Sequence, residues 1–256
     1  MSDSLSGRTA LVTGGGNGLG RAIAERLGAN GARVVLVGRD PYKLRAVSEE
    51  ADWPAGVRCV STDVSDAESV DRLAATVVDE DISILINNAG VAGPVLPLTA
   101  IEPKQWDEVF ATNVRGVYLM CRTFIPRMVE AGRGDVVNIA SVSGKRPLAN
   151  RTPYCASKMA VLGLTTTLAA EVGPLGVNVN SLSPGPVDGP RMKNVLRQEA
   201  ERSGISYADA EKAFVSRAIL GRMVREREVG DAVVAMLAMP GLCAADIDLS
   251  AGMVAR

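Results

Sequence analysis

A tyrosine and a lysine four residues apart, Tyr154 and Lys158, are the side chains of this sequence best suited to proton transfer. On a helix this spacing places the phenol and the ammonium group one turn apart on the same face. Free tyrosine titrates near pH ~10, so its pKa must fall by roughly 3 units, or about 4 kcal/mol, for proton exchange at neutral pH. A lysine about 4 Å away supplies about 4 kcal/mol at an effective dielectric of ~20. The alternative is a helix that merely carries an exposed lysine.

The absence of histidine narrows the chemistry further. Ser-His-Asp and Cys-His mechanisms are excluded, and a metal site is disfavoured. Acid–base work must fall to Tyr, Lys, Asp, Glu or Cys. The cysteines, which we interpret as reduced packing residues because they are widely scattered, are Cys59, Cys121, Cys155 and Cys243.

The overall composition excludes several kinds of partner. The net charge is -1, with no basic block and few aromatic residues, so no nucleic-acid surface is expected. The first residues lack the apolar core of a signal peptide, and no later run is long and apolar enough to span a bilayer. We therefore expect a soluble, cytoplasmic protein that does not bind membranes.

Short apolar runs alternate with helix-length segments along the chain. The predicted strands are Thr9–Thr13, Arg33–Val37, Val57–Thr62, Ile82–Asn87, Val136–Ser141, Val177–Leu182 and Ile247–Leu249. This alternation predicts one α/β domain over residues 1–256, a Rossmann-type doubly wound parallel sheet of about seven strands with helices on both faces. A long charged stretch at about 185–222 follows a Pro-Gly-Pro turn and is predicted to be a substrate loop or lid.

A glycine-rich turn follows the first predicted strand and opens a helix, as in a site for a dinucleotide. In Thr13-Gly-Gly-Gly-Asn-Gly-Leu-Gly20, Gly14 would permit a tight turn and Gly18 would let the backbone approach a pyrophosphate. Gly20 would let the helix pack closely on the strand. Because a strand precedes this turn and an amphipathic helix follows it, the turn is more specific than an isolated glycine cluster.

The end of the second predicted strand indicates which dinucleotide would bind. Gly38 stands where an NAD-selective site carries its ribose-binding carboxylate, and Arg39 follows, well placed for a 2′-phosphate. We interpret Asp40 as a helix N-cap, because Pro41 suits the first helical position. NADP(H) is therefore favoured, and NAD(H) stays open. The alternative is that Arg39 is a solvated loop residue.

Taken together, these motifs resemble those of the short-chain dehydrogenase/reductase family in its compact form, over nearly the whole chain. The matching features, in the family's order and at its usual separations, are Thr13-Gly-x-x-x-Gly-x-Gly20, Asn87-Asn-Ala-Gly90, Asn113, Ser141, Tyr154-x-x-x-Lys158 and Pro184-Gly185. Of the four tyrosines, only Tyr154 has a lysine four residues later. The resemblance implies an NAD(P)(H)-dependent oxidoreductase that interconverts a secondary alcohol and a ketone, with a small molecule as its partner.

The resemblance also implies the catalytic roles. Tyr154 would be the acid in reduction and the base in oxidation, and Ser141 would hydrogen-bond the same substrate oxygen. Lys158 would lower the tyrosine pKa and bind the nicotinamide ribose, while Asn113 would help hold a water linking the lysine to solvent. Taken alone, Ser141 could simply cap a turn and Asn113 could be a surface residue.

Cofactor contacts are implied at the ends of successive strands. Asp63 would meet the adenine, Asn87 and Gly90 would lie along the cofactor, and Val187 would approach the nicotinamide amide. The full expected set is Gly14, Gly16, Asn17, Gly18, Leu19, Gly20, Arg39, Asp63, Val64, Asn87, Ala89, Gly90, Tyr154, Lys158, Pro184, Gly185 and Val187. No metal ligands are expected.

Two departures from the family pattern bear on the site. The family often has a threonine shortly after its Pro-Gly, whose hydroxyl holds the carboxamide, but Gly189 takes that place here. The last strand region, 244–252, also lacks the family's usual Thr-Gly and Asp-Gly-Gly pairs. The carboxamide contact and the local geometry near the C-terminus are therefore expected to differ.

Substrate and assembly are less strongly specified. Cations near the predicted cleft, Lys145, Arg146, Arg151 and Arg191, raise the hypothesis of an anionic substrate, such as a hydroxy acid, a sugar acid or a 3-oxoacyl thioester. The other function class is a catalytically silent dinucleotide-binding sensor or scaffold, whereas the glycine spacing weakens the longer epimerase relatives. Gly163 and other small residues near Tyr154 suit close packing, either within one subunit or on a symmetry mate, and the resemblance implies a homo-oligomer, a dimer or a tetramer.

Overall fold

Seven parallel strands form the centre of the computed structural model, which describes residues 4–146 and 148–254. They lie in the order β3-β2-β1-β4-β5-β6-β9. Their bounds are β1 (Thr9–Thr13), β2 (Arg33–Gly38), β3 (Val57–Ser61), β4 (Ile82–Asn87), β5 (Gly134–Ile139), β6 (Val177–Pro184) and β9 (Asp246–Leu249). The doubly wound parallel sheet predicted from the sequence is confirmed. β5 ends two residues earlier than predicted, so Ser141 lies beyond the strand.

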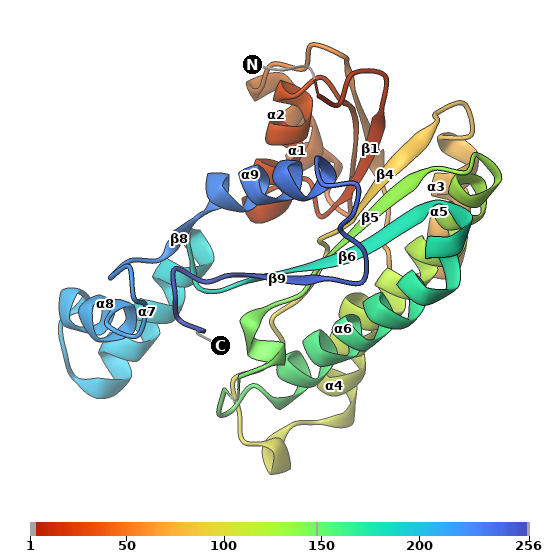
Figure 1. The fold of residues 1–256 in the computed structure, drawn as a ribbon. Helices are drawn as coiled ribbons and strands as arrows, with labels where there is room; N and C mark the ends of the chain where they lie inside the picture. Colours follow the sequence, from red (N-terminus) through yellow and green to blue (C-terminus); the bar gives the residue numbers. More distant parts are fainter. Residues whose placement is uncertain (1–3, 147, 255–256) are drawn as a thin grey trace.

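Helices cover both faces of this sheet, and the strands are therefore apolar on both sides. In β2, Val34 and Leu36 belong to one hydrophobic core, whereas Val35 and Val37 belong to the core on the opposite face. One face is covered by α1 (Gly18–Ala29), α2 (Pro41–Glu50) and α9 (Glu226–Leu237) (Figure 1). The other is covered by α3 (Ala67–Thr76), α5 (Gly116–Glu130) and α6 (Thr152–Val172) (Figure 1).

Two features of the helices matter for the site, the start of α2 and the junction between α4 and α5. Asp40 caps α2, since its carboxylate accepts hydrogen bonds from the backbone N–H groups of Tyr42 and Lys43, and Pro41 is the first helical residue, as predicted. The helix α4 (Pro103–Phe110) runs through a π-helical turn, Ala111–Arg115, into α5. Such wide turns are frequent at functional sites, and this one carries Asn113.

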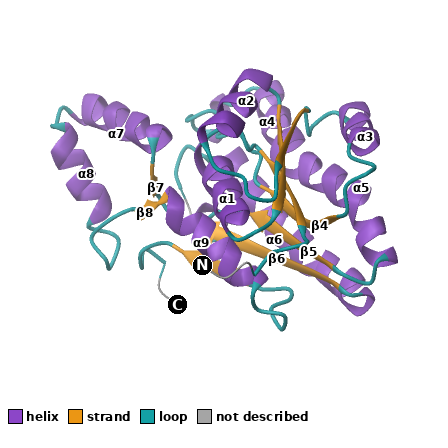
Figure 2. Ribbon diagram, turned by 90° about the horizontal axis from the view of Figure 1, so that it is seen from above, coloured by secondary structure: helices purple, strands orange, loops and turns teal. Residues whose placement is uncertain are grey.

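The segment after β6 forms a small separate layer. The short strand β7 (Val187–Asp188) pairs with β8 (Val224–Arg225), and between them in the chain come α7 (Pro190–Ser203) and α8 (Tyr207–Val215). Both helices stand away from the main sheet beside β7 and β8 (Figures 1 and 2). Within the described residues, no helix has the length and apolar character needed to cross a membrane.

The last strand completes the sheet despite its unusual sequence. β9 pairs in parallel with β6 over residues 181–184 and 246–249. Ala244 and Ala251, on either side of it, have left-handed backbones with φ of 57° and 53°. A left-handed backbone costs a residue with a Cβ about 1–2 kcal/mol. The departure from the family pattern therefore leaves the strand pairing intact and introduces local strain instead.

Candidate active site

The predicted site residues gather at one edge of the sheet. Because the strands are parallel and adjacent, their carboxyl ends meet along this edge, where ligands of such folds bind. The residues beyond these ends are Gly14, Gly16, Asn17, Gly18, Leu19 and Gly20 after β1, Arg39 after β2, Asp63 and Val64 after β3, Ala89 and Gly90 after β4, Ser141 after β5, and Gly185 and Val187 after β6. Asn87 and Pro184 are the last residues of β4 and β6.

The glycine turn after β1 is too tight for side chains at two positions. Gly14 has a left-handed φ of 68°, and a Cβ on Gly20 would lie 2.1 Å from the carbonyl oxygen of Gly14. Gly18 opens α1 with φ of 51°. The open N–H groups at the start of α1 therefore border a turn with little side-chain bulk, which suits a phosphate group.

Thr13 joins this turn to the loop after β4. Its Oγ1 accepts hydrogen bonds from the backbone N–H groups of Asn88 and Ala89, at 2.9 and 3.0 Å, and donates to the carbonyl of Ile86. Asn88 Nδ2 in turn donates to the carbonyl of Thr13 at 2.9 Å. Thr13 and Asn88 each lie within a motif recognised in the sequence. The sequence does not show that these two residues are hydrogen-bonded to each other.

A cavity of about 460 Å³ is lined by residues after β2 and β3 and, for the larger part, by the loop after β4 and by α4 with the turn that follows it. Arg39, Ser65, Val91 and Thr112 contribute to its lining, and the Arg39 side chain is exposed. Asp63 nearby accepts hydrogen bonds from the N–H and the hydroxyl of Ser65. Burial opposes ionisation of Asp63, but these bonds and the charge of Arg39 outweigh it and hold its pKa below the usual value. This cavity has the position expected for an adenosine.

Lys158 is buried, which excludes the alternative of an exposed lysine. It is 6% exposed, and its Nζ donates a 2.7 Å hydrogen bond to the carbonyl of Ile139 at the end of β5. Its Nζ lies 5.9 Å from the centre of the Tyr154 ring, one turn earlier on α6. The Arg151 guanidinium carbon lies 5.3 Å from the same ring centre. Both cations favour the ionised form of a phenol at this position.

Asn113 is also buried, so it is not a surface residue. It is 1% exposed, and its Oδ1 accepts from the N–H of Val91 at 2.8 Å. Its Nδ2 donates to the carbonyl of Val91 and to the hydroxyl of Ser157, and that hydroxyl donates to the carbonyl of Tyr154. A Cβ on Gly90 would lie 3.1 Å from Asn113 Oδ1 and 3.7 Å from Lys158 Nζ. Asn113 therefore lies beside the lysine and ties α6 to the loop after β4.

Ser141 caps a short helix that packs against α6. Its Oγ accepts a 3.1 Å hydrogen bond from the N–H of Ser143 and caps the short helix Val142–Gly144. Accepting this bond leaves the hydroxyl proton for a second partner. A Cβ on Gly144 would lie 3.0 Å from the backbone carbonyl carbon of Lys158. The turn that Ser141 caps therefore packs against α6, and the cap still leaves the hydroxyl proton available to a second partner.

A buried polar chain lies behind this group. Asn87 Nδ2 donates to Asn138 Oδ1, and Asn138 Nδ2 donates to Thr165 Oγ1, both at 2.9 Å. Asn87 Oδ1 is buried without a partner among the described residues. Cys121 also accepts from Asn87, but burial dominates and raises the pKa of its thiol to about 12. Asn138 and Thr165 were not predicted from the sequence, where their one signal is polarity within a buried strand and helix.

The predicted cations do not form one free positive patch. Lys145 is 9% exposed and forms ion pairs with Asp246 and Asp248 of β9. Arg146 is exposed, and its guanidinium lies 3.5 Å from the carbonyl oxygen of Met253. The side chain of Arg191 is outside the described part of the structure. The structure thus removes one of the cations on which the hypothesis of an anionic substrate depends.

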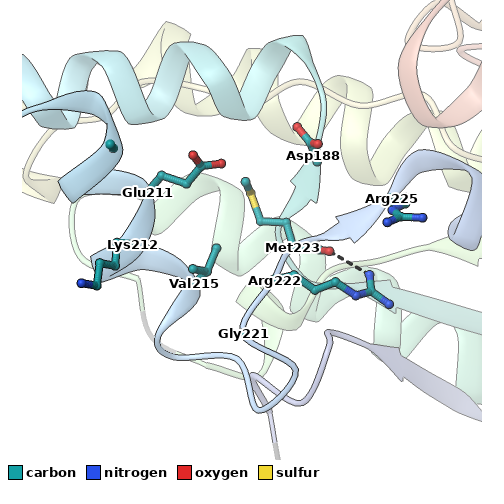
Figure 3. Close-up of a pocket in the computed structure, with 9 residues that line it drawn as sticks. Asp188, Glu211, Lys212, Val215, Gly221, Arg222, Met223 and Arg225 are labelled. Carbon is teal, nitrogen blue, oxygen red and sulfur yellow. Dashed lines mark hydrogen bonds between the residues drawn. The ribbon is translucent and has the colours of Figure 1, made fainter.

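A second cavity, of about 440 Å³, lies between α8 and the β7–β8 pair (Figure 3). Its lining includes Asp188, Glu211, Lys212, Met223 and Arg225, so it is strongly charged. It belongs to the segment predicted as a lid.

Comparisons with known proteins agree with this geometry. Residues 8–201 match the family model of the short chain dehydrogenases. D-threitol dehydrogenase of Mycolicibacterium smegmatis is 40% identical over 217 residues, which cover 80% of this chain and 83% of the relative. The crystal structure of a variant actinorhodin polyketide ketoreductase with NADPH matches with a TM-score of 0.90 at 30% identity, over 99% of each chain. NAD+-bound xylitol dehydrogenase matches with a TM-score of 0.90 at 25% identity, over 97% of this chain and 100% of that one.

Proposed function

Because the chain belongs to the short-chain dehydrogenase family and is an NAD(P)(H)-dependent oxidoreductase of alcohols and ketones, we propose that Tyr154 is its acid–base residue and NADP(H) its preferred cofactor. The observation that carries this proposal is the buried Lys158 one helical turn from Tyr154, with Ser141 and Asn113 at the same edge of the sheet. A silent binding protein would use such a lysine for the ribose alone and would have no need of the phenol one turn away.

In the proposed mechanism, the side chains transfer the proton and stabilise the charge that develops on the substrate oxygen. Bound nicotinamide supplies or accepts the hydride. Tyr154 donates its proton to the oxygen in reduction and removes it in oxidation, and Ser141 donates a hydrogen bond to the same oxygen. Lys158 stabilises the phenolate that forms when the proton leaves. Asn113 holds Ser157 and the loop after β4 in place, and through them the start of α6.

Features of the site fit a dinucleotide. The glycine turn at the start of α1 has the character of a diphosphate cradle, and the cavity beside Arg39 and Ser65 has room for an adenosine. We propose that the exposed Arg39 binds the 2′-phosphate. Charge-assisted hydrogen bonds contribute about 1.5–3 kcal/mol, so Arg39→Gln should weaken NADPH binding by roughly 10- to 150-fold. NADH binding should change little. Equal losses for both cofactors in a fluorescence titration would refute this role of Arg39.

We propose a neutral polyol or its ketose as the substrate class. Two of the matched proteins are named for threitol and xylitol, and the pairing of Lys145 removes one cation from the cleft. The test is a panel of polyols, sugar acids and 3-oxoacyl thioesters, with Tyr154→Phe as the inactive control. Preference for the neutral polyols supports the proposal, and preference for the acids or thioesters contradicts it.

We further propose a cytoplasmic dimer or tetramer whose subunits meet along α5 and α6. Tyr118 and Met159 are about half exposed on these helices, at 51% and 50%, and a Cβ on Gly163 would meet nothing within 4 Å. Light scattering after gel filtration should give two or four times the 26.8 kDa chain mass. A single-chain mass would contradict this assembly.

We propose that the 185–222 segment is a lid on the substrate side of the site.

A further inference from the structure

The carboxyl group of Glu226, the first residue of α9, lies between two loops at the sheet edge where the cofactor is expected. A Cβ added to Gly189 would lie 2.5 Å from Glu226 Oε1, and one added to Gly18 would lie 3.7 Å from the same oxygen. Gly18 opens α1 in the glycine turn, and Gly189 follows β7. One carboxyl oxygen is therefore next to both the expected diphosphate cradle and the segment after β6.

The missing side chain at Gly189 makes room for this carboxyl. A Cβ there would lie 3.3 Å from Glu226 Cδ, so a larger residue would have to displace the glutamate. The family resemblance implies a threonine at this place, with its hydroxyl on the nicotinamide carboxamide. The carboxyl group of Glu226 thus occupies space that the threonine side chain would take.

Burial and two nearby carboxylates disfavour a negative charge on Glu226, whereas two nearby cations and the N-terminus of α9 favour it. The residue is half-buried, and its carboxyl has no hydrogen-bond or ion-pair partner among the described residues. Burial is the main cause of its raised pKa, and Asp188 of β7 and Glu25 of α1 add to it. Arg21 and Lys193 act in the opposite direction.

Both opposing cations are near other carboxylates. Arg21 donates to Glu25 and Glu50 at 2.7 Å, and Lys193 lies 4.0 Å from Asp188. Neither is paired with Glu226. A diphosphate bound in the cradle would bring two more negative charges close to this carboxyl, and a charged carboxylate would repel them.

We infer that Glu226 binds the diphosphate of the dinucleotide as a neutral carboxylic acid, so that cofactor binding takes up a proton. A protonated carboxyl can donate one O–H hydrogen bond to a phosphate oxygen. This inference rests on the proposed dinucleotide site. Binding should be tightest at low pH and should weaken as the pH rises through the pKa of Glu226 in the free protein. In that range the Kd should rise by up to about tenfold per pH unit.

The test measures binding of ADP-ribose to the full chain by calorimetry between pH 5 and 9. This probe carries the diphosphate but has neither a nicotinamide nor a 2′-phosphate that titrates in this range. For the wild-type protein we expect the Kd to rise with pH and the apparent enthalpy to depend on the buffer, as proton uptake requires. Glu226→Gln keeps the shape and removes the titration, so its Kd should vary by less than about twofold over the same range.

Two further variants separate this role from a general effect on the fold. Glu25→Gln removes a carboxylate that helps raise the pKa of Glu226, so it should move the pH dependence to lower pH without abolishing it. Gly189→Thr combined with Glu226→Ala should bind ADP-ribose without pH dependence, because the titrating carboxyl is gone.

Three outcomes would overturn the inference. The first is the same pH profile for the wild-type protein and Glu226→Gln. The second is a pH dependence that appears with NADH but not with ADP-ribose, which would place the contact at the nicotinamide. The third is no binding of ADP-ribose, NADH or NADPH by the wild-type protein at any pH, which would refute the dinucleotide site itself and this inference with it.

Discussion

Replacing Lys158 by methionine should shift the pH dependence of alcohol oxidation without removing the chemistry. The ammonium nitrogen lies 5.9 Å from the centre of the Tyr154 ring. With the phenolate charge taken at the ring centre and an effective dielectric of ~20, one cation at this distance stabilises the phenolate by about 3 kcal/mol. That energy corresponds to about 2 pH units. The variant should therefore need a pH about 2 units higher to reach the same fraction of phenolate.

The assay is the pH profile of kcat/KM for an alcohol at saturating oxidised cofactor. At neutral pH the variant should be about 100-fold slower than the wild-type protein, and the deficit should shrink as the pH rises. Cofactor binding is measured separately by fluorescence, because Lys158 is also expected to contact the nicotinamide ribose.

Stability needs its own control in this experiment. The variant loses the hydrogen bond from Lys158 to the carbonyl of Ile139, and a buried unpaired carbonyl costs about 1–3 kcal/mol. Rates should therefore be measured well below the melting temperature of the variant. A loss of activity of the same size at every pH, in a folded variant with bound cofactor, would refute the electrostatic role of Lys158.

Three further predictions concern stability and reactivity. Ala244→Gly should raise the free energy of unfolding by about 1 kcal/mol, because Ala244 is exposed and has a left-handed backbone. Ala245→Gly is the control: its φ is not positive, so the substitution should lower the free energy of unfolding. Thermal unfolding measures both effects. Arg222 lowers the pKa of Glu228 from 4.5 to about 2, so this ion pair stabilises the fold fully above pH 4.5 and less as the pH falls toward 2. Glu228→Gln should cost about 0.5–1 kcal/mol at pH 7, since the pair is partly exposed, and denaturant melts should show this gap close in acid. Cys121, whose thiol pKa is about 12, should react with a thiol reagent at pH 8 only after unfolding, and fast labelling of the native protein would contradict its burial.

Local patterns in the sequence predicted much of the site. The spacing of Tyr154 and Lys158, the glycines of the turn after β1 and the cap formed by Asp40 each depend on a few neighbouring residues. Helix and turn geometry therefore fix their relations, and the sheet order follows from the alternation of elements. Their joint location also follows, because parallel strands end at one edge.

Contacts between distant parts of the chain were not predictable in this way. Lys145 looked like a cation available to a substrate, but Asp246 and Asp248, about a hundred residues later, pair with it. Glu226 gave no signal either, because its position depends on how α9 packs against α1 and on the space left by Gly189. Such relations depend on tertiary packing, which a single sequence does not specify.

The most direct test of the central claim is the rate of ketone reduction by Tyr154→Phe under saturating NADPH. General acid catalysis contributes about 10²–10⁴-fold, so kcat should fall by at least about 100-fold. NADPH binding should stay within a few-fold of the wild-type value, because the phenyl ring keeps its place on α6. A variant that binds NADPH and retains more than about a tenth of the wild-type kcat would contradict the assignment of Tyr154 as the proton donor.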